Sequence, residues 1–199
     1  MIAKNNFNSS TILVLILTLC FSCHTTKYSY SGDINGSLDF SKGKWLLNDI
    51  DAPFQIKESV YKVADAQFRE LIGSRFKTVI ESNEFLIPSN IPEDPSESLL
   101  RDLKNGTQYD FLIDIKTNAL KNEIGSLQIG SIDTPQDNIA TVNISVYDLN
   151  LLQKIYSSSV YGKLHITKDS KDFAFAKSAN EIILTGIEKL LKKMRDNSN

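Results

Sequence analysis

The segment 109–115, with the sequence YDFLIDI, constrains the fold of this chain more than any other stretch. Its apolar side chains follow one another almost without a break, which predicts a strand whose two faces are both covered. Asp110 and Asp114 flank the apolar centre, and they share one face of that strand with Leu112 because side chains alternate along a strand. Such a strand is expected in the middle of a sheet, with other elements packed on both sides.

Two long amphipathic helices and one short helix are expected around this strand. Apolar residues recur at helical spacing over 56–72 and again over 175–194. The short helix is expected to begin at Asp94 as its N-cap, with Pro95 at the first helical position and Gly106 as its left-handed end. Helices of this kind bury one apolar side against a sheet.

Strand-like patterns recur along the rest of the chain. The segments that carry them are 44–50, 75–81, 123–132, 140–147 and 153–166. One sheet with helices packed on it buries all of these apolar faces. The predicted fold class is therefore α/β (α+β), with a single mixed sheet, a long N-terminal helix, a short middle helix and a C-terminal helix.

The N-terminus has the features of a bacterial export signal. Lys4 supplies a positive start, residues 11–21 form an apolar run, and Ser22 is small. At about 1.5 Å per residue, the run is too short to cross the roughly 30 Å of hydrocarbon in a bilayer. Because Cys23 follows at once, the segment resembles a lipoprotein signal that is cut before Cys23. That resemblance implies that the Cys23 thiol carries diacylglycerol and that its amino group carries a further acyl chain such as palmitate.

These patterns divide the chain into four parts. We expect a lipoprotein signal peptide over 1–22, a lipid anchor with a flexible tether over 23–43, a single α/β domain over 44–195, and a disordered tail over 196–199. The tether is expected because 24–43 is polar and rich in Ser, Gly and Thr. The remaining length suits one domain with its own core.

Composition excludes several classes of function. Lys4 is the only charge in the signal, so 21 of the 22 basic side chains remain against 24 acidic ones, a net charge of −3. A balance of this kind does not favour nucleic acid. With Cys20 removed and Cys23 lipidated, no thiol remains for a disulfide, a metal site or a nucleophile. We therefore expect no cofactor and no metal.

The order of the expected elements resembles a group of bacterial envelope domains. The resemblance rests mainly on the turn Gly73-Ser-Arg-Phe76 and on the turn Val146-Tyr-Asp148. The group includes the curli secretion-channel subunit, the lipoprotein activators of penicillin-binding proteins and the amino-terminal domain of the Tol-system propeller protein. It implies a non-enzymatic α/β domain that binds another envelope protein. The connections 82–95 and 116–138 are too short and alternate too poorly for the membrane hairpins of the channel member.

Catalytic residues are sparse in this sequence. The two histidines are His24, in the expected tether, and His165, near a strand end, and neither belongs to a recognisable triad or metal pair. Asp110 and Asp114 could form a carboxylate pair that serves glycosidase or metal chemistry. Contacts at a strand end and at a helix cap explain these two residues better, so we assign no catalytic residue.

A polar strand face is the candidate surface for a partner. Tyr147 lies on one strand, in line with Thr141, Asn143 and Ser145, and the next strand carries Tyr156 and Tyr161. If that face is open, its aromatic and hydroxyl groups suit a partner protein or a glycan. The alternative is that these aromatics pack under a helix or across strands. The basic segment 189–195 is interpreted as a solvated helix end, with contact to anionic headgroups as the alternative.

The function expected from the sequence is therefore binding at a membrane. We expect a lipid-anchored envelope protein, at the outer membrane and facing the periplasm, that acts without catalysis as a binding, assembly or regulatory partner of another envelope protein. The alternatives are a carrier of a lipid or other hydrophobic ligand in a cleft and, third, a hydrolase of unknown substrate. The sequence does not predict the oligomeric state.

Overall fold

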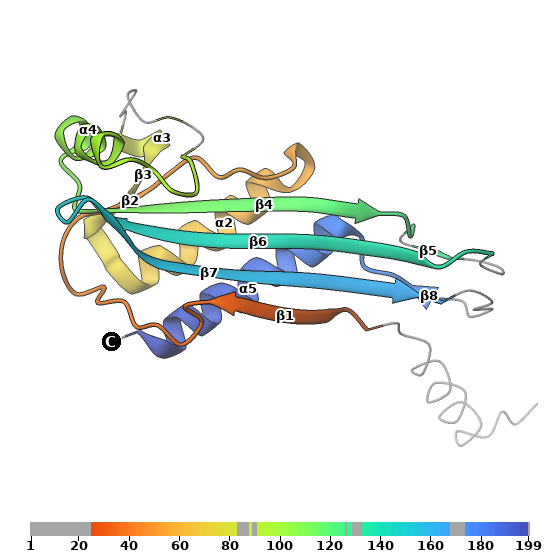
Figure 1. Cartoon of the computed structure of the whole chain (residues 1–199). Helices are drawn as coiled ribbons and strands as arrows, with labels where there is room; N and C mark the ends of the chain where they lie inside the picture. The colour runs from red at the N-terminus through yellow and green to blue at the C-terminus, as the bar shows by residue number, and fades with distance from the viewer. Residues whose placement is uncertain are drawn as a thin grey trace, which may run out of the picture.

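A mixed six-stranded sheet forms the centre of the protein (Figure 1). The computed structural model describes residues 25–82, 88, 91–125, 127, 128, 133–167 and 174–198. The strands of the sheet are β1 (Lys27–Gly32), β2 (Trp45–Leu47), β3 (Phe76–Thr78), β4 (Phe111–Asn122), β6 (Gln136–Asp148) and β7 (Gln153–Ile166). Their order is β1-β7-β6-β4-β2-β3. Strand β2 runs parallel to β3 and β4, and the other neighbours are antiparallel. The predicted central position of the 109–115 segment is confirmed, because β4 pairs on both sides.

Helices cover the two faces of this sheet unequally (Figure 1). The two long helices, α2 (Phe54–Ile72) and α5 (Ala179–Asn197), pack on one face, here called the inner face. The shorter α4 (Glu97–Thr107) packs on the opposite, outer face. A turn of 3-10 helix, η1 (Gly73–Arg75), and α3 (Val79–Ser82) flank β3. The predicted α/β class with one mixed sheet and packed helices is confirmed.

The main core lies between the inner face and the two long helices. Ile113 and Ile115 of β4 meet Val142 of β6 there, together with the apolar stripes of α2 and α5. Helix α5 approaches the strands closely at Gly186, where a Cβ atom would lie 3.2 Å from Cγ2 of Val142 and 3.1 Å from Cγ1 of Val160. The regular apolar spacing in both helices thus serves one continuous core.

A second core lies under α4 on the outer face. Leu46 of β2, Leu112 of β4 and Tyr147 of β6 pack there against Leu100 and Leu103 of α4. Both faces of β4 are therefore buried along its first half, which explains the nearly continuous apolar character of that segment.

The segment after the expected anchor differs from the prediction. Instead of a flexible tether through residue 43, residues Lys27–Gly32 form β1, which pairs antiparallel with β7. The alternation in this strand places Tyr28 and Tyr30 over α5, where the Lys189 and Lys193 ammonium groups lie 5.1 and 4.7 Å from their ring centroids. This corrects the tether, which can extend only to residue 26. Cys23 lies outside the described residues.

Two helix boundaries also differ from the prediction. Helix α4 is capped by Ser96, whose Oγ accepts from the Leu99 amide at 3.3 Å, while Asp94 bonds Lys154 instead. The helix ends at Thr107, and its left-handed cap is Gln108, with φ of 59°, two residues beyond the predicted cap Gly106.

The C-terminal helix begins four residues later than predicted, and it extends to Asn197, into the segment predicted to be a disordered tail. Its N-terminus is a capping box in which Ser178 and Glu181 bond each other's backbone amides. Phe175 lies before it in β8 (Ala174–Phe175), which pairs with β5 (Leu127–Gln128) in a separate two-stranded sheet. The expected strand over 75–81 is likewise shorter, because β3 ends at Thr78 and α3 follows.

Candidate functional site

A groove of about 600 Å³ crosses the outer face of the sheet beside α4. We call it the strand-face groove. Its floor is formed by polar side chains of β4, β6 and β7, namely Lys116, Asn118, Thr141, Asn143, Ser159 and Tyr161. The groove exists because α4 covers only the half of the outer face that carries Leu112 and Tyr147. The polar half of the predicted strand face is therefore open.

Strand register sets these side chains in two rows. In one row Asn118 lies opposite Thr141, and Thr141 lies opposite Tyr161. In the next row Lys116 lies opposite Asn143, and Asn143 lies opposite Ser159. Each row thus offers amide or hydroxyl groups that both donate and accept hydrogen bonds. A surface of this kind recognises a polar partner through several directional contacts.

Asn143 stands out in the floor of the groove. Its Oδ1 atom is buried and has no hydrogen-bond partner among the residues that the structure describes. Buried acceptors are nearly always bonded in folded proteins, and an unpaired one costs stability. The floor of the groove therefore contains a buried acceptor that the described residues leave unsatisfied.

A buried polar cluster closes the α4 end of the groove. Asp114 is only 4% exposed, and its Oδ1 accepts a bond from Asn48 Nδ2 at 3.0 Å. The Lys116 ammonium lies 3.7 Å from Asp114 Oδ2 and also donates to the carbonyl of Ile91. Burial raises the pKa of Asp114 more than Asn48 and Lys116 lower it. Burial, followed by the nearby Asp114 carboxylate, also raises the pKa of Tyr147 to about 12.

The segment 91–94 forms one wall of this end. Lys154 Nζ donates to the Glu93 carbonyl at 2.9 Å and bonds Asp94 Oδ1 at 3.1 Å. The Tyr147 hydroxyl lies 3.4 Å from the same Glu93 carbonyl. Side chains of β6 and β7 therefore hold this wall against the sheet, and the polar cluster supports the groove rather than opening to solvent.

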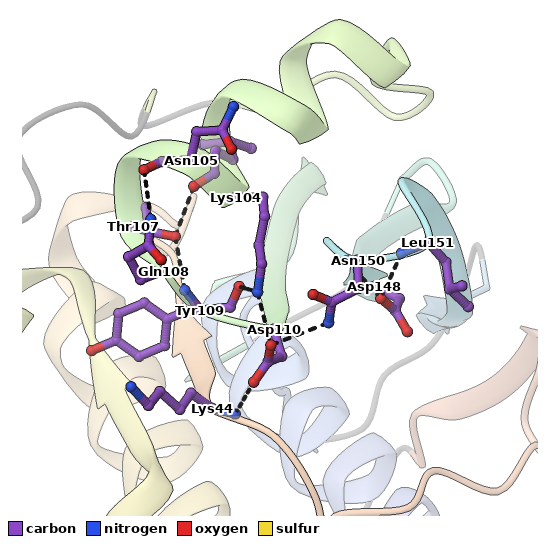
Figure 2. A network of polar contacts seen from close by, with 11 residues as sticks. Lys44, Lys104, Asn105, Thr107, Gln108, Tyr109, Asp110, Asp148, Asn150 and Leu151 are labelled. Carbon is purple, nitrogen blue, oxygen red and sulfur yellow. Dashed lines mark hydrogen bonds and ion pairs between the residues drawn. The ribbon is translucent and has the colours of Figure 1, made fainter.

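Asp110 belongs to a different network, at the rim of the sheet (Figure 2). One carboxylate oxygen accepts from the Lys44 backbone amide at 2.9 Å, and the other accepts from Lys104 Nζ at 2.8 Å and from Asn150 Nδ2 at 3.1 Å. Partial burial alone would raise the pKa of Asp110, but these three donors lower it to about 2. Asp110 thus ties β2, α4 and the β6–β7 turn together, as the interpretation of a strand-end contact predicted.

The three tyrosines predicted as a partner-binding face do not share one surface. Tyr147 is 1% exposed under α4, and Tyr156 is 2% exposed in the main core on the opposite face. Tyr161, at 38% exposed, lies in the strand-face groove. Tyr156 and Tyr161 are an odd number of positions apart in one strand, so alternation alone places them on opposite faces. The predicted face is therefore corrected to the groove with Tyr161.

The remaining candidates lie away from the groove floor. His165 Nδ1 lies 2.7 Å from Asp137 Oδ1, which Lys163 approaches at 3.1 Å, and these contacts, His165 first, lower the pKa of Asp137. His24 lies outside the described residues. Among the described residues no group of His, Cys, Asp and Glu side chains is arranged to hold a metal ion. Within the same residues, no helix is both long and apolar enough to cross a membrane.

Comparison with known proteins gives distant structural similarity. No protein-family model and no curated protein matches this chain. The PelC dodecamer from Paraburkholderia phytofirmans is 11% identical, with a TM-score of 0.46 over 85% of this chain and 97% of that chain. A neuraminyllactose-binding hemagglutinin homolog from Helicobacter pylori is 14% identical, with a TM-score of 0.40 over 81% and 91%. Similarities at this level carry no argument about function.

Proposed function

We propose that this protein is a lipid-anchored bacterial envelope protein that binds another envelope protein without catalysis, as an assembly or regulatory partner. The observation that carries the proposal is the strand-face groove, which leaves two rows of polar side chains open between α4 and β1. The anchor is Cys23, which follows the apolar export signal. The location proposed is the outer membrane, with the domain in the periplasm.

The chemistry of the groove supports recognition of a protein. Tyr161 offers a large amphipathic ring, and tyrosine is among the side chains that dominate binding energy at interfaces. Thr141, Asn143 and Ser159 surround it with short polar groups whose rotamers lose little entropy on binding.

The placement of ionisable groups supports a role without catalysis. Perturbed pKa values mark functional sites only when the groups are directed into a cleft, since structural ion pairs perturb them too. Asp110 and Asp137 each bond several partners of the protein itself. Asp114 is buried and bonds Asn48. These carboxyl groups therefore form structural contacts within the protein.

Site-specific photocrosslinking in the cells that make the protein tests the proposed surface. A benzophenone amino acid is placed at Tyr161, and the matched control carries it at Lys62, which is exposed on α2 at the far side of the sheet. We expect a discrete crosslinked protein species from position 161 and none from position 62. Equal crosslinking from both positions, or none from position 161, would contradict binding through the groove.

The anchor is tested separately. Cys23→Ser removes the thiol that would be acylated, so the protein should lose its membrane association or keep its signal. Fractionation of cells followed by mass spectrometry of the N-terminus measures both properties. A processed Cys23→Ser protein that still fractionates with membranes would contradict the lipid anchor.

A further inference from the structure

The position of β1 fixes which end of the sheet lies near the anchor. Lys27, the first residue of β1, pairs with Lys163 near the end of β7, and Gln136 at the start of β6 pairs with Ile166. We call this the β1-start end of the sheet. The opposite end carries the β6–β7 turn (Figure 1). The exposed Leu151 belongs to this turn.

The chain between Cys23 and β1 is short compared with the sheet. Lys27 follows Cys23 by four positions, so even a fully extended chain spans at most about 14 Å. Strand β7 has 14 residues, which corresponds to roughly 45 Å at the usual rise of a strand. An anchor on Cys23 therefore holds the β1-start end at the bilayer surface, while the β6–β7 turn can lie far from it.

We infer that the protein stands end-on at the membrane, with its β1-start end against anionic lipid headgroups and the β6–β7 turn pointing away. This inference rests on the proposed lipid anchor and deepens it, because it assigns a surface of the folded domain to the lipid. The partner at that surface is the bilayer itself, and the strand-face groove stays free for a protein.

The chemistry of the β1-start end suits anionic headgroups. Lys27, Lys121 and Lys177 are exposed there. Two of the acidic groups at the same end are paired with cations: Glu123 lies 3.4 Å from Lys121, and Asp137 contacts Lys163 and His165. Cationic side chains near a bilayer with negative lipids favour its surface, and they reinforce an acyl anchor.

A different orientation, flat on the α5 side, is less well supported. Helix α5 carries a basic C-terminal half, but Lys189 and Lys193 lie over the rings of Tyr28 and Tyr30. Reaching headgroups would require these two ammonium groups to leave their rings. The end-on orientation needs no such change.

End-on attachment would place the strand-face groove close to the bilayer. Ser29 and Ser31 of β1 flank the two polar rows, so the rows lie two and four residues from Lys27. At the rise of a strand this is roughly 7 to 13 Å along β1. The groove would then open sideways close to the bilayer, where it can reach the membrane-proximal part of another envelope protein.

Single-cysteine labelling tests the orientation, and lipidation of Cys23 leaves no other thiol in the processed chain. The full chain is made in a lipoprotein-processing bacterium as three variants, Thr167→Cys next to β7, Leu151→Cys in the far turn and Lys192→Cys on α5. All three positions are exposed. Each variant is labelled with a fluorophore and placed in phosphatidylcholine–phosphatidylglycerol vesicles whose headgroups carry a nitroxide quencher. Thermal melts check that each variant is folded.

We expect the nitroxide lipid to reduce the fluorescence at position 167 at least twofold and to leave positions 151 and 192 nearly unchanged. Quenching at 192 equal to that at 167 would show a flat orientation and overturn the inference while keeping the anchor. Quenching at 151 but not at 167 would overturn it as well. If the protein fails to float with the vesicles, the anchor itself is wrong, and the proposed function fails together with the orientation.

Discussion

Asp110 and Asp114 lie on the same face of β4, four residues apart, and yet their pKa values shift in opposite directions. At the rim, Asp110 accepts bonds from a backbone amide, an ammonium and a side-chain amide (Figure 2). Deeper in the protein, the buried Asp114 has one close donor, Asn48, and a more distant ammonium on Lys116. For Asp110, three donors to the carboxylate lower the pKa more than partial burial raises it. For Asp114, the fewer donors do not offset the effect of deep burial, so the pKa is raised.

The two carboxyl groups consequently affect stability with opposite signs. The lowered pKa of Asp110 means that its contribution is present above the ordinary value of 3.8 and is lost as the pH falls towards 2. The raised pKa of Asp114 means that the folded state favours the protonated form. Its charge therefore lowers the stability as the pH rises from 3.8 through the raised pKa.

The largest effect is expected from Tyr147→Ala, which removes a buried ring near Asp114. Tyr147 is fully buried with Leu112 in the outer core, so the change should cost about 3–5 kcal/mol of unfolding free energy. Urea unfolding measures this loss. Tyr161→Ala is the matched control, and it should cost less than about 1 kcal/mol because that ring is partly exposed. Equal losses for the two variants would mean that Tyr147 is not a core residue.

The next effect is expected from Lys116→Met. Removing the ammonium leaves the buried Asp114 carboxylate with Asn48 as its close donor, which should cost about 2 kcal/mol at pH 7. The control is Lys121→Met on the same strand, whose exposed pair with Glu123 should be worth less than about 0.5 kcal/mol. Chemical denaturation of both variants at pH 7 and pH 4 measures the difference.

The pH dependence of the Lys116→Met loss identifies its cause. A protonated Asp114 needs no cation, so the loss should shrink as the pH falls towards 4. A loss of the same size at both pH values would assign the role of Lys116 to its bond with the Ile91 carbonyl instead.

Much of the fold could be predicted from local sequence patterns. The bounds of β7 match the predicted strand 153–166, and the regular apolar stripe of α5 predicted the main core. The face shared by Asp110, Leu112 and Asp114 followed from alternation alone. The prediction failed at β1, because the Ser and Gly residues around Tyr28 and Tyr30 are typical of a flexible segment. The strand is stabilised by the packing of these two rings against α5, which the local sequence does not reveal.

The candidate site was predictable only in part. The alternating polar residues Thr141, Asn143 and Ser145 of β6 could be recognised in the sequence. Which of them stay open to solvent depends on where α4 lies. The opposite orientations of Tyr156 and Tyr161 could have been found by counting positions along one strand. The opposite pKa shifts could not, since they depend on donors from Lys44, Asn48 and Asn150, which are distant in sequence.

A smaller effect is expected from Asp110→Asn. The neutral amide loses the charge-assisted bonds from Lys104 and the Lys44 amide, which should cost about 1 kcal/mol at pH 7 after allowance for solvent screening. The cost should vanish near pH 2, where Asp110 itself becomes protonated. Urea melts at pH 7, 4 and 2 measure it, with Asp102→Asn on the exposed side of α4 as the control. A loss that persists unchanged at pH 2 would contradict the lowered pKa.

The smallest effect on stability at pH 7 is expected from Asp114→Asn. This variant is informative because of the direction in which its stability changes with pH. The amide keeps an oxygen for Asn48 Nδ2 and removes a buried charge, so the two changes should cancel to within about 1 kcal/mol. As the pH falls from 7 to 4, the unchanged protein should gain stability relative to this variant, because only the unchanged protein can take up a proton at position 114. Asp110→Asn should show its main change below that range, so the two pH windows separate the two carboxyl groups. If the difference in unfolding free energy between the two proteins stays constant from pH 7 to pH 4, then Asn48 and Lys116 offset the burial of Asp114. The contrast between the pKa shifts of Asp110 and Asp114 would then be wrong.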